Sequence, residues 1–139
     1  PDGIITAAGQ AMAVLPLHPR LAHMVYRADA QGEGRLACDI AALLSEREIL
    51  IGEHKRSCDL LDRIEALQAF RARGRDGAQS FGAEQTACQR VELAARQYLR
   101  LLRSRNTETV PNADTVGILL SFAYPDRVAL QRAPVGVVA

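Results

Sequence analysis

Aromatic residues and lysines are scarce in this chain of 139 residues. It has three Phe, three Tyr and no Trp, and Lys55 is the single lysine beside sixteen arginines. With so few rings, a core must be built mainly from Leu, Ile, Val and Ala. The arginine excess indicates either a GC-rich genome or contact with nucleic acid. The formal net charge of +1 excludes a strong overall field, so a surface for a polyanion would have to be a local patch.

Cysteine pairs, membrane spans and targeting segments are also missing. Cys38, Cys58 and Cys88 are odd in number and widely spaced, with no C-x-x-C, so neither a disulfide framework nor a zinc site is predicted. Cys38 lies among apolar positions and is expected to be a small core residue. No apolar run approaches the length of about 18 residues that a membrane span needs, and no signal peptide is recognisable. We therefore expect one cytoplasmic domain with no metal site and no membrane partner.

Apolar residues recur at spacings of three and four, which predicts a mainly α-helical bundle. We expect helices at about 9–14, 19–30, 35–46, 57–70, 83–103 and 115–123. Pro19 occupies the first position of its helix, where its missing N–H costs nothing, and Gly32 is expected in the left-handed conformation that ends it. The predicted buried face of this helix consists of Leu21, Met24, Val25 and Ala28.

The later helices are expected to bury similar faces and to begin at polar caps. Ser57 is the predicted N-cap of the helix at 57–70, and Asp114 is that of the helix at 115–123. The predicted buried positions of the helix at 35–46 are Leu36, Ile40, Leu43 and Leu44. Those of the longest helix, at 83–103, are Val91, Ala94, Ala95, Tyr98, Leu101 and Leu102.

Three segments lack helical periodicity. Residues 74–82, GRDGAQSFG, are rich in glycine, but no G-K-[ST] follows and no strand precedes them. We interpret them as a mobile loop rather than a phosphate cradle. Residues 49–52 are too short for a helix and are also expected to form a loop. Beyond Pro125, which should keep the preceding residue out of the helical region, residues 128–138 alternate in a way that predicts a strand.

Arginines supply the candidate binding residues. Arg96, Arg100 and Arg103 are spaced i, i+4 and i+7 on the longest helix, so their guanidinium groups share an exposed face that could follow phosphates. The alternative is a solvated face, on which Glu92 and Arg96 form an ordinary surface ion pair. The weaker candidates, near the first helices, are Arg20, Arg27 and Arg47.

No catalytic centre is recognisable. The chain contains no Walker lysine, no D-E-A-H tetrad and no arginine finger in a recognisable frame, so we expect no ATP hydrolysis by this chain alone. Asp59 and Asp62 could form an acid–base pair in principle, but a solvated helical face explains them more simply. We therefore predict no catalytic residue, metal or cofactor here.

Three ordered stretches carry a resemblance to a known family. They are residues 2–24, DGIITAAGQAMAVLPLHPRLAHM; residues 36–47, LACDIAALLSER; and residues 124–129, YPDRVA. The first resembles the helicase-associated region of DEAH-box RNA helicases, and the other two resemble the bacterial HrpB-type branch. The chain departs from the family pattern at Ala7 and Ala8, where proline and leucine are usual, and at Gln10, where arginine is frequent.

The resemblance implies that the chain is an excised accessory part of an ATP-dependent helicase. Residues 1–18 would be the remnant of a truncated winged helix, residues 19–123 a helical ratchet-like domain, and residues 124–139 the start of an OB-like β segment. Such a domain would hold the backbone of single-stranded RNA or DNA, weakly on its own, and dock on the motor domains of the same polypeptide. ATP and Mg would bind to those motors. The alternative is a free-standing α-helical protein-interaction module with no nucleic-acid role.

Overall fold

The computed structural model describes residues 9, 12–57, 59–102 and 112–125. Its elements are α2 (Pro19–Ala30), α3 (Gly34–Ser45), the 3-10 helix η1 (Gly52–Arg56), α4 (Leu60–Arg73), α5 (Arg75–Ser80), α6 (Gln85–Leu102) and α7 (Ala113–Ala123). Within these residues there is no strand, and β-pairing is limited to an isolated antiparallel bridge between Leu50 and Ala83. The prediction of a mainly α-helical fold is confirmed.

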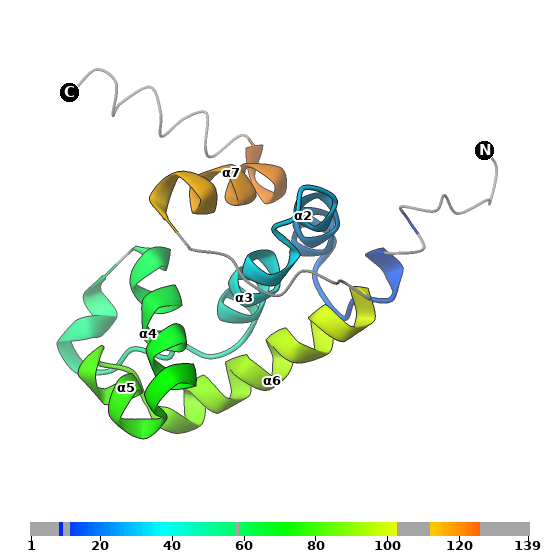
Figure 1. The fold of residues 1–139 in the computed structure, drawn as a ribbon. Coiled ribbons are helices and arrows are strands. Elements are labelled where there is room, and N and C mark those ends of the chain that lie inside the picture. The colour runs from blue at the N-terminus through cyan, green and yellow to red at the C-terminus, as the bar shows by residue number, and fades with distance from the viewer. Residues whose placement is uncertain (1–8, 10–11, 58, 103–111, 126–139) are drawn as a thin grey trace, which may run out of the picture.

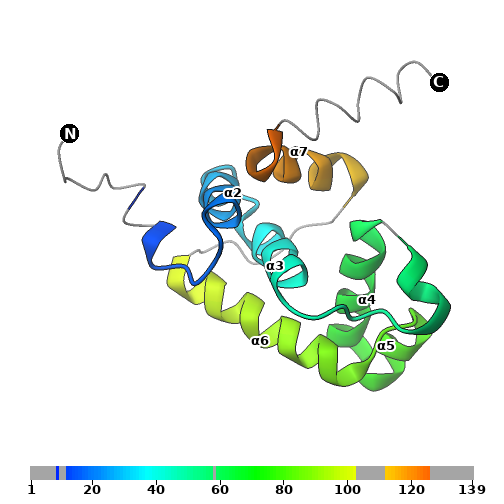
Figure 2. The same ribbon diagram turned by 180° about the vertical axis from the view of Figure 1, so that it is seen from behind.

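The helix α3 lies at the centre of the molecule and contacts α2, α4 and α6 (Figure 1). The long helix α6 runs beneath α3, from the end where α4 and α5 pack together to the end where α2 lies. Figure 2 shows the same path from behind, with α7 against α2. The helix α6 packs against α3, α4 and α5 along one side only. Its other side therefore faces solvent.

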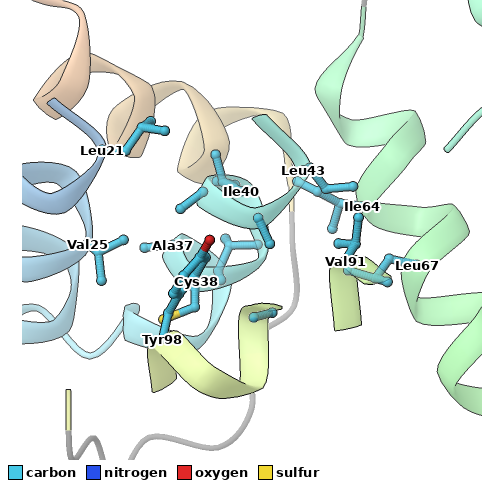
Figure 3. Close-up of a cluster of buried hydrophobic side chains, with 14 of the residues drawn as sticks. Leu21, Val25, Ala37, Cys38, Ile40, Leu43, Ile64, Leu67, Val91 and Tyr98 are labelled. Atoms are coloured by element: carbon cyan, nitrogen blue, oxygen red, sulfur yellow. The ribbon is translucent and has the colours of Figure 1, made fainter. Parts of the chain in front are cut away.

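Small aliphatic side chains fill the space around α3 (Figure 3). Ile40 is fully buried, and so is Val91 of α6, while Tyr98 of the same helix is 4 % exposed. All four residues of the predicted α2 face are buried. Burying such a side chain contributes about 1.5–3 kcal/mol, so the predicted aliphatic core is the main source of stability. Among the described residues, no helix is both long enough and apolar enough to cross a membrane.

Two predicted core positions are wrong. Leu44 is 45 % exposed and Leu101 is 37 % exposed. Leu44 lies in the last turn of α3, where the following residues 45–48 are all exposed and the chain leaves the core. Leu101 lies in the last turn of α6, beyond Tyr98, the last buried residue of this helix. Periodicity marks the face of a helix but not the point at which its neighbours end.

The start and end of α2 follow the prediction. Pro19 is the first helical residue, and the Nδ1 atom of His18 accepts a hydrogen bond from the backbone N–H of Arg20 at 3.2 Å. Gly32 has a φ of 80°, the left-handed conformation expected after this helix. Tyr124, before Pro125, is also outside the helical region as predicted, with φ −134° and ψ 65°.

Two N-caps differ from the prediction. Asp59, not Ser57, caps α4, because its Oδ1 accepts from the N–H of Leu61 at 2.9 Å. Asn112, not Asp114, caps α7 through the N–H of Thr115. In both places two side chains that could cap the helix lie two residues apart. The residue that caps is the one whose side-chain oxygen reaches a backbone N–H of the first turn.

The expected loop at 74–82 is wrong, because residues Arg75–Ser80 form the helix α5. Gly74 turns the chain with a φ of 63°. Gly77 then lies so close to α4 that a Cβ atom built on it would be 1.9 Å from the carbonyl oxygen of Ala69. This contact needs glycine, so the same residue that weakens the periodic pattern allows the helix to pack.

The residues that follow α3 pair with the segment between α5 and α6. The N–H of Ile51 donates to the carbonyl of Gly82, and the N–H of Glu84 donates to that of Ile49, both at 2.9 Å. Ile49 and Leu50 lie outside any helix, as expected for a loop at 49–52, and they are buried. Of the predicted helix at 9–14, the structure describes Gly9, Met12 and Ala13, which are helical, and Val14, which lies in a turn. The predicted strand at 128–138 lies outside the described residues.

Candidate nucleic-acid interface

The exposed side of α6 carries no acidic side chain. Its exposed residues are Thr86, Gln89, Arg90, Leu93, Arg96, Gln97, Arg100 and Leu101. Glu92 is the only acidic residue of this helix, and it is 8 % exposed. The side chain of Arg96 is 65 % exposed. Along α6, positive charge therefore faces solvent while negative charge is withdrawn toward the core.

Glu92 can be buried because its charge is paired with that of Arg71 of α4. The Nε atom of Arg71 donates to Oε1 of Glu92 at 2.8 Å, and its Nη2 atom lies 2.6 Å from the same oxygen. The two terminal nitrogens of Arg71 also donate to the carboxylate of Asp39 of α3, at 2.8 and 2.6 Å. Arg71 thus joins three helices through a bidentate pair and a second carboxylate.

The charges of this network balance. Arg71 and Arg96 are the cations, and Asp39 and Glu92 are the anions, with Arg96 Nε 3.3 Å from Glu92 Oε2. Burial alone would lower the pKa of Arg71, but the hydrogen bonds and charges of Asp39 and Glu92 outweigh it and raise that pKa. Arg71 therefore stays protonated, and the carboxylates of its partners already balance its positive charge.

The ion pair of Glu92 with Arg96, expected under the alternative of a solvated face, is present, but Glu92 is buried and its link to Arg71 was missed. One signal was available: Asp39 is the only charged residue in the run LACDIAALL. A carboxylate in such a run must meet a partner when it is buried. The partner itself could not be named, because Arg71 is 32 residues away along the chain.

A pocket of about 470 Å³ opens between α4 and α6 beside this network. It is lined by Phe70, Arg71, Gln89, Glu92, Leu93 and Arg96. The lining therefore combines apolar side chains, one side-chain amide and the paired charges of the network. A second pocket, of about 450 Å³ near η1, has a different character, because Glu53, Asp62 and Glu65 all line it. An acidic lining of this kind repels phosphate.

The predicted arginines divide into two groups. Arg96 and Arg100 lie on the exposed face of α6, one turn apart, and Arg103 lies outside the described residues. Arg20 and Arg27 lie on α2 and hold α7. Arg20 donates to the carbonyl of Ala123 at 3.3 Å and lies 5.6 Å from the ring centre of Tyr124. Arg27 lies 4.8 Å from that of Phe122.

These contacts give Arg20 and Arg27 a part in packing α7 through cation–π attraction. The structure does not bring them onto the α6 face with Arg96 and Arg100. Arg47 is exposed in the segment after α3. Of the six predicted arginines, the structure therefore places Arg96 and Arg100 together on the α6 face.

Metal and thiol chemistry have no support in the part of the chain described. Within it, no group of three or more His, Cys, Asp or Glu side chains could hold a metal ion. Cys38 and Cys88 are buried and unpaired. Burial raises the pKa of both thiols, that of Cys88 to about 11, so neither is a ready nucleophile.

Comparison with known proteins finds no matching family model and no matching curated protein.

Proposed function

We propose that this chain is an accessory helical domain of an HrpB-type DEAH-box RNA helicase, and that the exposed face of α6 holds the backbone of a single-stranded nucleic acid. One observation carries the proposal: the solvent side of α6 presents arginines and neutral residues, while Glu92 is buried. The sequence resemblance to the helicase-associated region supplies the identity of the parent protein.

The spacing of the arginines suits a backbone contact. Arg96 and Arg100 are one turn apart, which separates them by about 6 Å along the helix axis. Guanidinium groups offer forked donors to phosphate oxygens and do not read sequence. With so few cations on one face, the isolated chain should bind weakly and in a strongly salt-dependent way.

The buried carboxylate of Glu92 does not prevent such a contact. Its Oε1 atom is held by Arg71, and Arg96 approaches only the other oxygen, through Nε at 3.3 Å. Arg96 can therefore keep its Nε atom at Glu92 and offer its terminal nitrogens to a phosphate.

Exposed apolar side chains offer a docking surface for the motor domains. Ile118 of α7 is 54 % exposed and Val14 is 52 % exposed. In the proposed parent, the motors bind ATP and Mg, and this domain supplies a rigid wall along the path of the strand. Docking would cover apolar area that otherwise stays in water.

Fluorescence anisotropy with a labelled single-stranded RNA tests the backbone contact. Affinity is measured between about 50 and about 200 mM salt for the wild type and for the double variant Arg96→Gln/Arg100→Gln. Losing two phosphate contacts should weaken binding and flatten the slope of log K against log salt by about 1.4. The matched control is Arg56→Gln/Arg75→Gln, which removes the same charge from two exposed arginines that lie outside α6 and are not candidate binding residues.

The control pair should keep the wild-type slope, apart from a small general loss of affinity. An α6 variant with the same affinity and slope as the wild type would refute the proposal and favour a protein-interaction module. In a longer protein with motor domains, the α6 variant should impair unwinding more than basal ATP hydrolysis. Equal loss of both activities would instead place these arginines in support of the motor.

A further inference from the structure

The pocket between α4 and α6 lies directly beside the arginine face. Arg96 belongs to both, because it lines the pocket and its side chain is 65 % exposed. Leu93, the most exposed large apolar residue of α6 at 67 %, also lines the pocket. A single-stranded nucleic acid whose phosphates lie along Arg96 and Arg100 would therefore pass its other chemical groups over this opening.

The floor of the pocket is electrically neutral. Arg71 is neutralised by Asp39 and Glu92, and the remaining charge of Glu92 is balanced by Arg96. A phosphate has little to gain inside the pocket, because its donors are already occupied by carboxylates. A neutral group can enter the pocket without displacing any of these ion pairs.

The lining suits a flat, polar-edged ring. Phe70 and Leu93 supply apolar surface, and the side-chain amide of Gln89 can both donate and accept a hydrogen bond. The volume of about 470 Å³ falls in the range of pockets that hold small ligands. Nucleobases have this combination of a π-face and a hydrogen-bonding edge, and they stack on apolar and guanidinium surfaces.

We propose that this pocket accepts one unstacked base of the single strand whose phosphates lie along Arg96 and Arg100. The inference rests on the proposed function and adds a base site to it. Phe70 and Leu93 enclose the ring, Gln89 meets its edge, and Arg96 lies between the base and its phosphate. Because one amide can meet either donors or acceptors, the site should tolerate different bases.

Two single-stranded RNAs of equal length test the proposal, one of which carries an abasic site at its centre. Both keep the full backbone charge, so their salt slopes should be equal. The wild-type chain should bind the intact strand more tightly by about five-fold or more, as expected for one stacked base. A strand with 2-aminopurine at the same position should change its fluorescence on binding.

The variant Leu93→Ala removes one wall without touching a charge, and it should reduce both the preference for the intact strand and the fluorescence change. Its matched control is Leu101→Ala, a second exposed leucine of α6 that does not line the pocket. This control should behave as the wild type does. Thermal unfolding of both variants verifies that the fold is kept.

The outcomes separate this inference from the proposed function. Equal binding of the intact and abasic strands, with a normal salt slope, would overturn the base site and leave the backbone contact standing. An unchanged preference in Leu93→Ala would also overturn it, because the base would then be held away from this pocket. A wild-type chain that binds neither strand would refute both proposals.

Discussion

The guanidinium of Arg71 and the carboxylate of Asp39 form two parallel hydrogen bonds, Nη1 to Oδ2 at 2.8 Å and Nη2 to Oδ1 at 2.6 Å. Asp39 is 3 % exposed, so this pair connects α4 to the most buried helix of the fold. Glu92 extends the connection to α6. The helix that carries the candidate interface is thereby fixed to the core by charge as well as by apolar packing.

Replacing Arg71 by Met should destabilise the fold by about 3–5 kcal/mol, because two buried carboxylates lose their partner. Urea unfolding followed by circular dichroism measures the change. The matched variant is Arg96→Gln, which removes the exposed partner of the same Glu92 and should cost less than about 1 kcal/mol. Equal costs for the two variants would contradict the assignment of Arg71 as the buried link.

Most of the helical fold could be predicted because it depends on local information. The bounds 19–30 of α2 agree with the structure, since proline, glycine and a clean apolar period all act within that segment. The helix α5 was missed for a physical reason: it has only six residues and packs through Gly77 against the carbonyl of Ala69. A close contact made by a glycine adds no apolar side chain to the helical period of either segment.

The candidate site was predictable in its exposed half only. The i, i+4 spacing places Arg96 and Arg100 on one face, and this depends on helix geometry alone. The withdrawal of Glu92 from that face depends on Arg71, which lies 21 residues before it. Spacing describes one helix, whereas the charge balance of the face is decided by a side chain from another.

Adjacent leucines of α3 should respond differently to truncation. Leu43 is 8 % exposed and lies near Ile64 of α4 (Figure 3). The variant Leu43→Ala should lower the free energy of unfolding by about 2–4 kcal/mol, from lost burial and a residual cavity. Leu44→Ala, at a position that is 45 % exposed, should change it by no more than about 0.5 kcal/mol. Similar denaturant midpoints for the two variants would refute the observed face of α3.

Two helical glycines should respond to alanine with opposite signs. A methyl group on Gly77 would meet the carbonyl oxygen of Ala69 at 1.9 Å, so Gly77→Ala must push α5 away from α4. We expect a loss of about 1–3 kcal/mol, as in other overpacked sites. Gly117 of α7 has open space around its Cβ position, and Gly117→Ala should stabilise by about 0.5–1 kcal/mol. Thermal unfolding compares both with the wild type, and a stabilising Gly77→Ala would refute the close α4–α5 contact.

Acid should selectively remove the contribution of Glu48. Burial would raise the pKa of this carboxyl, but hydrogen bonds from Arg63 and from the N–H groups of Leu50 and Ile49, together with the charge of Arg63, lower it below 4.5. The folded pKa is thus below the unfolded one. The stabilisation is therefore complete above about pH 4.5 and is lost as the pH falls through the folded pKa.

The variant Glu48→Gln tests this dependence directly. It should be less stable than the wild type at pH 7, and the difference in unfolding free energy should shrink as the pH falls below about 4.5. The double variant Glu48→Gln/Arg63→Gln completes a mutant cycle, because Arg63 Nε lies 3.0 Å from Glu48 Oε2. In the Arg63→Gln background, replacing Glu48 should have a smaller effect at pH 7 and a weaker dependence on pH. A stability difference that stays constant from pH 7 to pH 3 would show that the charge of Glu48 does not stabilise the fold.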